Sequence, residues 1–220
     1  MAQDLDPLDD HELAVRLPRQ RRSRASWGRI LEAGVALVEE GGYDAFTIAA
    51  VCERAAVPPR AVYERVNTKD GLFLAVYEKK MADVEADRDV LFDAAARIAV
   101  GASGSIRLAV GAMVGTFSAH EAFLRSVILI SGVHPEINRR GSVLTRALGE
   151  RFAALVLRAR SEVRCVDPEE AVQMAFSTAF SALAIRTSYG ADFSGPAVDD
   201  DSFVDHLASM IDSYLLRPAH

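Results

Sequence analysis

Two short helical segments, joined by a corner that contains two prolines, dominate the pattern of residues 47–66. Thr47 can cap the first segment because its hydroxyl oxygen can accept a hydrogen bond from an amide of the first turn. Apolar residues then recur with helical spacing at positions 48, 51, 52 and 55. Pro58 biases Val57 towards extended geometry, and Pro59 has the fixed φ that suits the first position of a new helix. The sequence therefore predicts a tight helix-turn-helix.

The second segment is short and has a polar face. Val62 and Val66 lie four residues apart and are expected to point inwards. This leaves Arg60, Ala61 and Tyr63 on or near the open face. A short polar helix fits the major groove of double-stranded DNA, so the segment predicts a DNA reader. Arg60 is the expected base-contacting residue, because its guanidinium fork matches guanine O6 and N7.

These segments and their neighbours resemble the TetR family of bacterial transcription regulators. The resemblance runs from Ile30 to Phe73 in the family's usual spacing. The residues that carry it are Ile30-Leu31-Glu32-Ala33-Gly34, Gly42-Tyr43, Thr47-Ile48, Ala55-Ala56-Val57, Val62-Tyr63 and Lys69-Asp70-Gly71-Leu72-Phe73. The resemblance implies an all-α chain, with a three-helix N-terminal helix-turn-helix domain followed by a helical domain for ligand binding and dimerisation.

Four residues depart from the family's pattern. Ala56 stands where glycine is usual, and Pro58 stands where a capping serine is usual. Arg60 stands where glycine is common, and Val66 where phenylalanine is usual. Pro58 forgoes a side-chain cap worth about 1 kcal/mol, and Val66 fills less core. We expect these changes to affect local stability more than the mode of docking on DNA.

Several residues around the helix-turn-helix are expected to contact the DNA backbone. Thr47, Tyr63 and Lys69 are the candidates for holding phosphates. Basic residues at positions 16, 19, 21, 22 and 24 lie directly upstream. A solvated linker can have the same composition, but an arm before a DNA-reading module can neutralise phosphates or enter the minor groove. We therefore expect Arg21, Arg22 and Arg24 to extend the contact with DNA.

The charge of the 220-residue chain is unevenly placed. Its net charge of −6 argues against a protein that coats nucleic acid without regard to sequence. Residues 16–82 nevertheless carry twelve basic and eight acidic side chains, whereas the other residues sum to −10. Acidic residues crowd positions 1–15, the reverse of a secretory signal. We predict a disordered acidic tail over 1–15, a DNA-binding domain over 16–66 and an effector-binding and dimerisation domain over 67–220.

The remaining composition indicates a globular chain without recognisable catalytic chemistry. Half of the residues are hydrophobic, which suits a sizeable core. Apolar runs such as 126–133 are too short to span a bilayer, so we expect a cytoplasmic protein with no membrane partner. Cys52 and Cys165 are too few and too far apart to indicate a disulfide framework or a zinc site. No phosphate-binding loop, dinucleotide turn or nucleophile elbow is recognisable, so we expect neither an enzyme nor a cofactor or metal.

Helical patterns continue from residue 68 towards the C-terminus, and no segment shows the alternation of a strand. The first helix of the chain, which carries Trp27 and Ile30, is expected to end at Gly41-Gly42. Another helix is expected from Thr68 towards Arg97. Asp167 and Pro168 mark a clear helix start, because aspartate caps and proline suits the first turn. The later helices are expected over 105–119, 121–132, 136–164, 168–189 and 201–216.

The last two of these helices are the candidates for a homodimer interface. The first has a stripe of small residues that permits close approach of another helix: Ala171, Ala175, Ala179 and Ala182. The second has the spacing of a bundle seam: Phe203, Val204, Leu207, Met210, Ile211, Tyr214 and Leu215. The alternative is that both stripes are buried within one chain. The resemblance favours dimerisation, because members of the family pair through their final helices.

The resemblance also implies an effector cavity in the second domain. The candidate lining residues are Met113, Phe117, His120, Arg125, Phe176 and Phe180. Core packing explains the apolar members equally well, while His120 and Arg125 could orient a largely apolar ligand. We therefore expect a repressor that a small-molecule effector releases from a palindromic operator. The alternative is a helical carrier or enzyme whose helix-turn-helix no longer recognises a specific DNA sequence.

Overall fold

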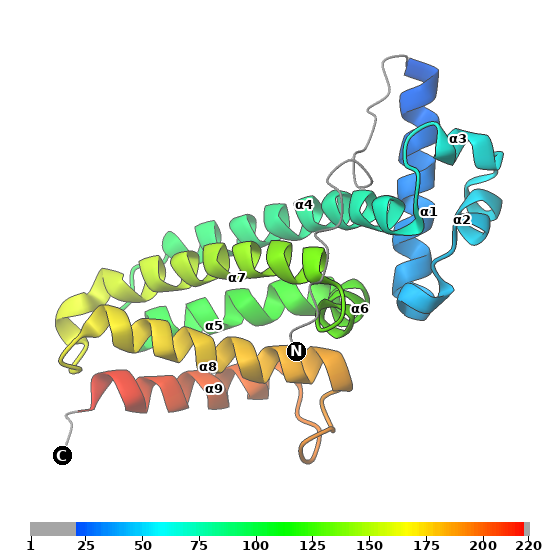
Figure 1. Cartoon of the computed structure of the whole chain (residues 1–220). Coiled ribbons are helices and arrows are strands. Elements are labelled where there is room, and N and C mark those ends of the chain that lie inside the picture. Colours follow the sequence, from blue (N-terminus) through cyan, green and yellow to red (C-terminus); the bar gives the residue numbers. More distant parts are fainter. Residues whose placement is uncertain (1–20, 218–220) are drawn as a thin grey trace, which may run out of the picture. The chain divides into compact units, whose positions relative to one another are not determined.

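The computed structural model of the protein describes residues 21–217, and the side chains of residues 24–217. This part of the chain is helical and contains no strand, which confirms the predicted all-α class. The elements, labelled as in Figure 1, are α1 (Arg21–Ala45), α2 (Ile48–Ala55), α3 (Pro59–Tyr63), α4 (Lys69–Ala96), α5 (Ala102–Ala119), α6 (Glu121–Ser131), α7 (Pro135–Val156), the 3-10 helix η1 (Leu157–Glu162), α8 (Pro168–Tyr189) and α9 (Asp200–Leu216).

The chain divides into two compact units within α4. The first unit ends at Asp83 and the second begins at Val84. The domain boundary predicted from the sequence lies before α4, between residues 66 and 67. Where the functional boundary falls stays a prediction.

The first unit packs α1 to α3 against the beginning of α4. Gly42, with φ 65° and ψ −161°, breaks the helical geometry of α1 at the predicted glycine pair. The chain then turns so that Tyr43 and Phe46 meet Phe73 of α4, with ring centroids 4.8 Å and 5.5 Å apart. The buried side chains of this unit include Trp27, Ile30, Val38, Val51, Cys52, Val62, Val66, Leu72 and Val76.

The helix-turn-helix has the predicted cap at Thr47 and the predicted helix start at Pro59. Thr47 Oγ1 accepts a hydrogen bond from the amide of Ala50 at 3.1 Å. Ala56 ends α2 in the left-handed conformation, with φ 50° and ψ 52°. Pro58 precedes α3 without a side-chain cap, and Pro59 is its first residue. The corner therefore holds a strained alanine and an uncapped short helix.

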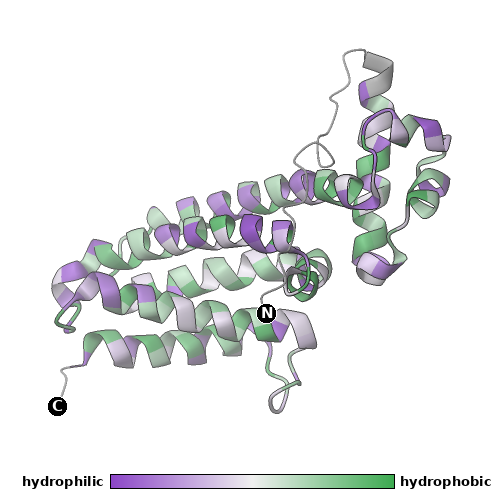
Figure 2. Ribbon diagram, viewed as in Figure 1, coloured by the Kyte–Doolittle hydropathy of each residue, from purple (hydrophilic) through white to green (hydrophobic). Residues whose placement is uncertain are grey.

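The second unit is built around α5. The helix buries side chains on several of its faces and packs against α7, α8 and α9, and its ribbon is largely apolar in Figure 2. Between α5 and α6 the chain bends by 92° at His120. Among residues 21–217, no single helix is long and apolar enough to cross a membrane. Only α5 and α6 taken together, as one bent pair, have the length and composition of such a span.

Two helix ends in the second unit differ from the sequence prediction. The segment expected as one helix over 136–164 is α-helical only to Val156 and continues as the 3-10 turn η1. Arg158 in this turn donates to the backbone oxygen of Ala96 at 2.6 Å. Glu162 accepts the amide of Ala102 at 3.3 Å, so α5 begins at Ala102 rather than at residue 105. The tighter turn thus caps the end of α4 and the start of α5.

Gly34 is expected to be required for the packing of α1 against α4. A β-carbon there would overlap Val76 Cγ2 and lie 3.1 Å from Cε2 of Phe46. Gly34→Ala should therefore lower the free energy of unfolding by about 1 to 3 kcal/mol through overpacking. Chemical denaturation followed by the fluorescence of Trp27, the single tryptophan, measures it.

Gly28→Ala is the matched control for this change. The residue lies in the same helix, and a β-carbon there meets no atom within 4 Å. Alanine has a better helix propensity than glycine by about 1 kcal/mol, so this variant should be as stable as the wild type or slightly more stable. Equal stability of the Gly34 and Gly28 variants would contradict the packing argument.

Ala56→Gly is expected to stabilise the first unit. Alanine in the left-handed region carries a steric penalty of roughly 1 kcal/mol that glycine avoids. The free energy of unfolding should rise by up to about 1 kcal/mol, because the native backbone is unchanged. Thermal denaturation checks this, with Ala50→Gly, inside α2, as a control that should lower stability.

Candidate nucleic-acid interface

The short helix α3 presents two side chains to solvent and one to the core. Val62 is fully buried, whereas Arg60 is exposed and Tyr63 is 51% exposed. Ala61 lies half-buried between them. The guanidinium of Arg60 makes no hydrogen bond or ion pair within the part of the chain that the structure describes. Arg60 and Tyr63 thus form a polar face on a helix that Val62 anchors.

The guanidinium of the neighbouring Arg54, unlike that of Arg60, is paired within the chain. Its guanidinium donates to both carboxylate oxygens of Glu40, at 2.8 Å and 2.6 Å. The hydrogen bond from Arg54 lowers the pKa of the Glu40 carboxyl, so the pair stays ionised. Because this fork is already occupied, Arg54 ties α2 to α1, whereas Arg60 keeps a fork that can bind an external acceptor.

Thr47 can serve both the helix and a phosphate. Its hydroxyl oxygen accepts a hydrogen bond from the amide of Ala50. The hydroxyl proton remains able to donate, and the residue is exposed. A phosphate oxygen is the expected acceptor.

Lys69, the other predicted phosphate ligand, is held in place by Tyr43. Its ammonium donates to the backbone oxygen of Tyr43 at 2.9 Å and lies 3.8 Å from the centroid of that ring. The Tyr43 hydroxyl in turn donates to Asp70. Burial and this hydrogen bond raise the pKa of Tyr43, so its phenol stays protonated at neutral pH. Lys69 has three N–H donors, so further donors remain for a phosphate.

Sequence reasoning did not assign a role to Tyr43. The signal was present, because Gly42-Tyr43 is part of the family pattern and lies just after the predicted helix end. The hydrogen bond from Lys69 spans 26 residues, and this pairing cannot be obtained from local spacing.

The predicted basic arm lies only partly within the described residues. Positions 16 and 19 fall outside them, and helix α1 begins at Arg21. Arg21, Arg22 and Arg24, which we placed in an arm, therefore have helical backbone in the first turns of α1. Arg24 is exposed. Contact of these three residues with DNA stays a prediction.

The structure brings three of the predicted effector-binding residues together. Phe180 lies 6.0 Å from Phe117 and 5.9 Å from Phe176 by ring centroids. Phe176 also packs against Phe152 and Gly149, where a β-carbon would come within 2.8 Å of its ring. These rings fill space between α5, α7 and α8, so they belong to the core. A role in lining a ligand cavity stays a prediction.

The other three predicted effector residues are either buried or paired with other groups of the chain. Met113 is buried within α5. His120 Nε2 lies 2.9 Å from a carboxylate oxygen of Asp87. Arg125 donates to the backbone oxygen of Thr187 and to Glu121, both at 3.0 Å. Each polar member thus has a partner in the chain.

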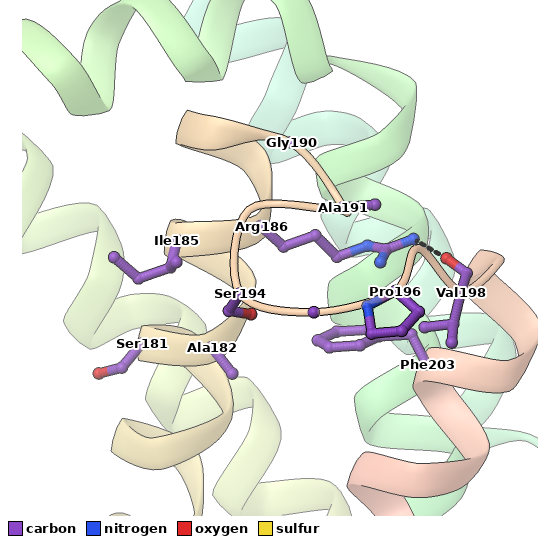
Figure 3. A pocket seen from close by; sticks show the side chains of 11 residues that line it. Ser181, Ala182, Ile185, Arg186, Gly190, Ala191, Ser194, Pro196, Val198 and Phe203 are labelled. Carbon is purple, nitrogen blue, oxygen red and sulfur yellow. Dashed lines mark hydrogen bonds between the residues drawn. The ribbon is translucent and has the colours of Figure 1, made fainter.

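Two clefts in the second unit were not found from the sequence. One, of about 420 Å³, lies between α8, the start of α9 and the loop that joins them (Figure 3). Arg186 crosses this cleft, donates to Val198 O and to Asp200, both at 2.8 Å, and lies over the ring of Phe203. Arg186 thereby ties the loop to α9. The other cleft, of about 450 Å³, is lined by α4, α5 and α9.

The stripes proposed for a dimer interface are mostly buried within the chain. Ala171, Ala175 and Ala179 of α8 face its interior, as do Leu207 and Ile211 of α9. These residues are covered within one chain, and whether the two helices also form the dimer interface stays a prediction. Helical spacing identified the apolar stripes but could not tell which neighbour covers them. The large apolar side chains left exposed on these helices are Met174, Ile185, Tyr189, Met210 and Tyr214.

Comparisons with known proteins agree with this geometry. Residues 30–76 match the family described as bacterial regulatory proteins, tetR family. No curated protein matches the sequence. The fold is similar to that of a TetR-family transcriptional regulator from Mesorhizobium loti, with a TM-score of 0.68 and 17% identity over 89% of this chain and 97% of that chain.

Two further structures with similar folds come from other bacteria. The TetR-family regulator PfmR from Thermus thermophilus has a TM-score of 0.61 and 18% identity over 87% of this chain and 99% of that chain. The fatty acid degradation regulator FadR from Bacillus halodurans has a TM-score of 0.60 and 13% identity over 84% of this chain and 94% of that chain. The matched residues contain the whole helix-turn-helix, so the chain has a DNA-binding domain of the tetR type and is a DNA-binding transcriptional regulator.

Proposed function

We propose that the protein is a cytoplasmic repressor that binds a palindromic operator as a homodimer and is released by a small molecule. The observation that carries this is the conformation of α3, where Val62 is buried and Arg60 is exposed, with no partner for its guanidinium among residues 24–217. The helix-turn-helix of each chain is the reading head of the proposed dimer. Two identical reading heads related by a two-fold axis impose the same symmetry on the two half-sites of the DNA. Binding rather than catalysis is the proposed activity.

Arg60 is the proposed base reader, and three other residues are proposed to fix its register. A guanidinium can donate two parallel hydrogen bonds to guanine O6 and N7. Thr47, Tyr63 and Lys69 would hold phosphates, because a hydroxyl, a phenol and an ammonium can each donate to a phosphate oxygen. Lys69 would do so from a position that its hydrogen bond to Tyr43 fixes.

The proposed dimer uses the exposed stripes of α8 and α9. Met174 and Ile185 on α8 and Met210 and Tyr214 on α9 are between 45% and 65% exposed. Large apolar side chains that recur on the open sides of two adjacent helices are typical of an interface. A four-helix contact between two chains would bury them.

The proposed switch acts through α4. This helix runs without a break from Lys69 beside the helix-turn-helix to Ala96 in the second unit. A ligand can shift an equilibrium only by its differential affinity for the two states, and full release needs a preference on the order of 5 kcal/mol. The effector must therefore bind the chain much more strongly in one spacing of the reading heads.

Selection of DNA fragments from the source genome tests the reading head. Wild-type protein should enrich one two-fold symmetric sequence, and Arg60→Ala should weaken binding to it by about 1 to 3 kcal/mol and relax the preference at one base pair of each half-site. Arg60→Lys is the matched control, because it keeps the charge and loses the fork; it should retain affinity for phosphates but also lose base preference.

An Arg60→Ala variant with the wild-type affinity and motif would show that another residue reads the bases. Binding of wild-type protein without any enriched sequence would favour the alternative of a helical carrier or enzyme with a vestigial helix-turn-helix.

Charged substitution on the exposed stripe of α9 tests the dimer. Met210→Glu combined with Tyr214→Glu should yield folded monomers that lose operator binding, because both side chains are exposed within one chain and one head makes few contacts. Sedimentation and gel-shift assays measure both effects. Val133→Glu, at a residue that is more exposed still, is the control and should remain dimeric. A dimer that survives the double change would place the interface elsewhere.

A further inference from the structure

A groove of about 450 Å³ in the second unit lies outside the predicted effector residues. Its lining comes from the second half of α4, from α5 and from the first turn of α9. Pockets of roughly 300 to 1,000 Å³ are typical of small-molecule sites. The groove is therefore large enough for a small organic ligand.

The middle of the groove is formed by two glycines on α5. Gly111 and Gly115 are one helical turn apart and face Val204 of α9 and Leu91 of α4, respectively. A β-carbon would lie 3.9 Å from Val204 at the first position and 3.4 Å from Leu91 at the second. Those are ordinary contacts, so the space persists because the side chains are absent. A longer side chain at either position would fill it.

The side of the groove at α4 is apolar. It is lined by Leu91, Ala94 and Ala95 of α4 and by Ile98, which follows two residues after the end of that helix. Leu91 is 36% and Ile98 is 47% exposed. Exposed apolar side chains that gather in one concave place indicate a binding surface more strongly than scattered ones.

The end of the groove at α9 has one negative charge without a partner. Arg107 is paired with Asp205, and Asp200 accepts hydrogen bonds from Ser118 and Arg186. Asp201 is exposed and has no ion pair or hydrogen bond to its side chain among residues 24–217. The local charges therefore cancel except for the Asp201 carboxylate.

We propose that this groove binds an amphiphilic organic cation, with its apolar body along α4 and α5 and its charged group at Asp201. The ligand is a cation because the unpaired charge at the groove is negative. Asp201 and Val204 lie on a different side of α9 from Met210 and Tyr214, by the 3.6-residue period of the helix. The proposed dimer leaves the groove open.

One wall of the groove belongs to α4, the helix that begins next to the helix-turn-helix in the chain. Leu91, Ala94 and Ala95 belong to the same helix as Lys69. A cation that fills the groove would thus contact the helix through which the proposed switch acts. Its role as the effector rests on the proposed function, whereas its binding does not.

Calorimetric titration of the full chain tests the binding. The probe is decyltrimethylammonium below its micelle concentration, with decanoate as the anion of equal chain length. We expect the cation to bind one site per chain and decanoate to bind at least fivefold more weakly. Gly115→Leu should abolish cation binding by filling the groove. Gly141→Leu is the matched control in α7, where a β-carbon meets no atom within 4 Å, and it should bind like the wild type.

Asp201→Asn separates the charge from the apolar contact. It should weaken the cation by about two- to fivefold, the range for an exposed ion pair, and leave binding of decanol unchanged. Absence of cation binding, equal binding of decanoate, or unchanged binding to the folded Gly115→Leu variant overturns the proposal. Circular dichroism and thermal denaturation verify that each variant folds.

A gel-shift assay then tests the effector role separately. The cation should weaken operator binding of the wild type and of Gly141→Leu, and should not affect Gly115→Leu. Tight binding in the groove with unchanged operator affinity would overturn the effector role while leaving the DNA-binding function intact. Failure of the wild type, as well as of both variants, to bind any operator would instead reject the proposed repressor.

Discussion

The packing of α1 against the first turns of α4 fixes the geometry of the DNA-binding unit. Gly34 lets Val76 approach the backbone of α1, and Phe73 packs edge-on against Tyr43 and Phe46. The polar contacts at the same place reinforce this packing, because Lys69 and Asp70 both bind Tyr43. Since α2 and α3 lie between these two helices in the chain, a shift of α4 against α1 would move the segment that carries the proposed base reader.

The corner of the helix-turn-helix is locally unfavourable and is held by the core beneath it. Ala56 has a left-handed backbone and Pro58 gives α3 no side-chain cap. A five-residue helix could not persist alone in water, because helix nucleation is unfavourable. The burial of Val62 and Val66 supplies the missing stability. The exposed side chains of α3 are therefore not needed for packing and are available for contact with DNA.

The sequence predicted what local spacing controls and missed what distant residues control. The Thr47 cap, the helix break at Gly42 and the capped start of α8 at Asp167 each depend on neighbours within four residues. The start of α5 depends on Glu162, which is 60 residues away in the chain. Apolar periodicity located the stripes of α8 and α9, yet the covering neighbours are tertiary. The glycine-lined groove gave no periodic signal, because it is defined by absent side chains.

The second unit has two open apolar surfaces, for which we propose two different partners. Met210 and Tyr214 lie on one side of α9, whereas Val204 borders the groove with α4 and α5 on another. The proposed two-fold contact between α8 and α9 of two chains would cover the first surface and leave the second in water. Leu91 and Ile98 then gain burial only from a ligand or from movement of α4 towards α9. A ligand that covers these residues would oppose such movement, and this difference in burial would supply the differential affinity that the proposed switch through α4 needs.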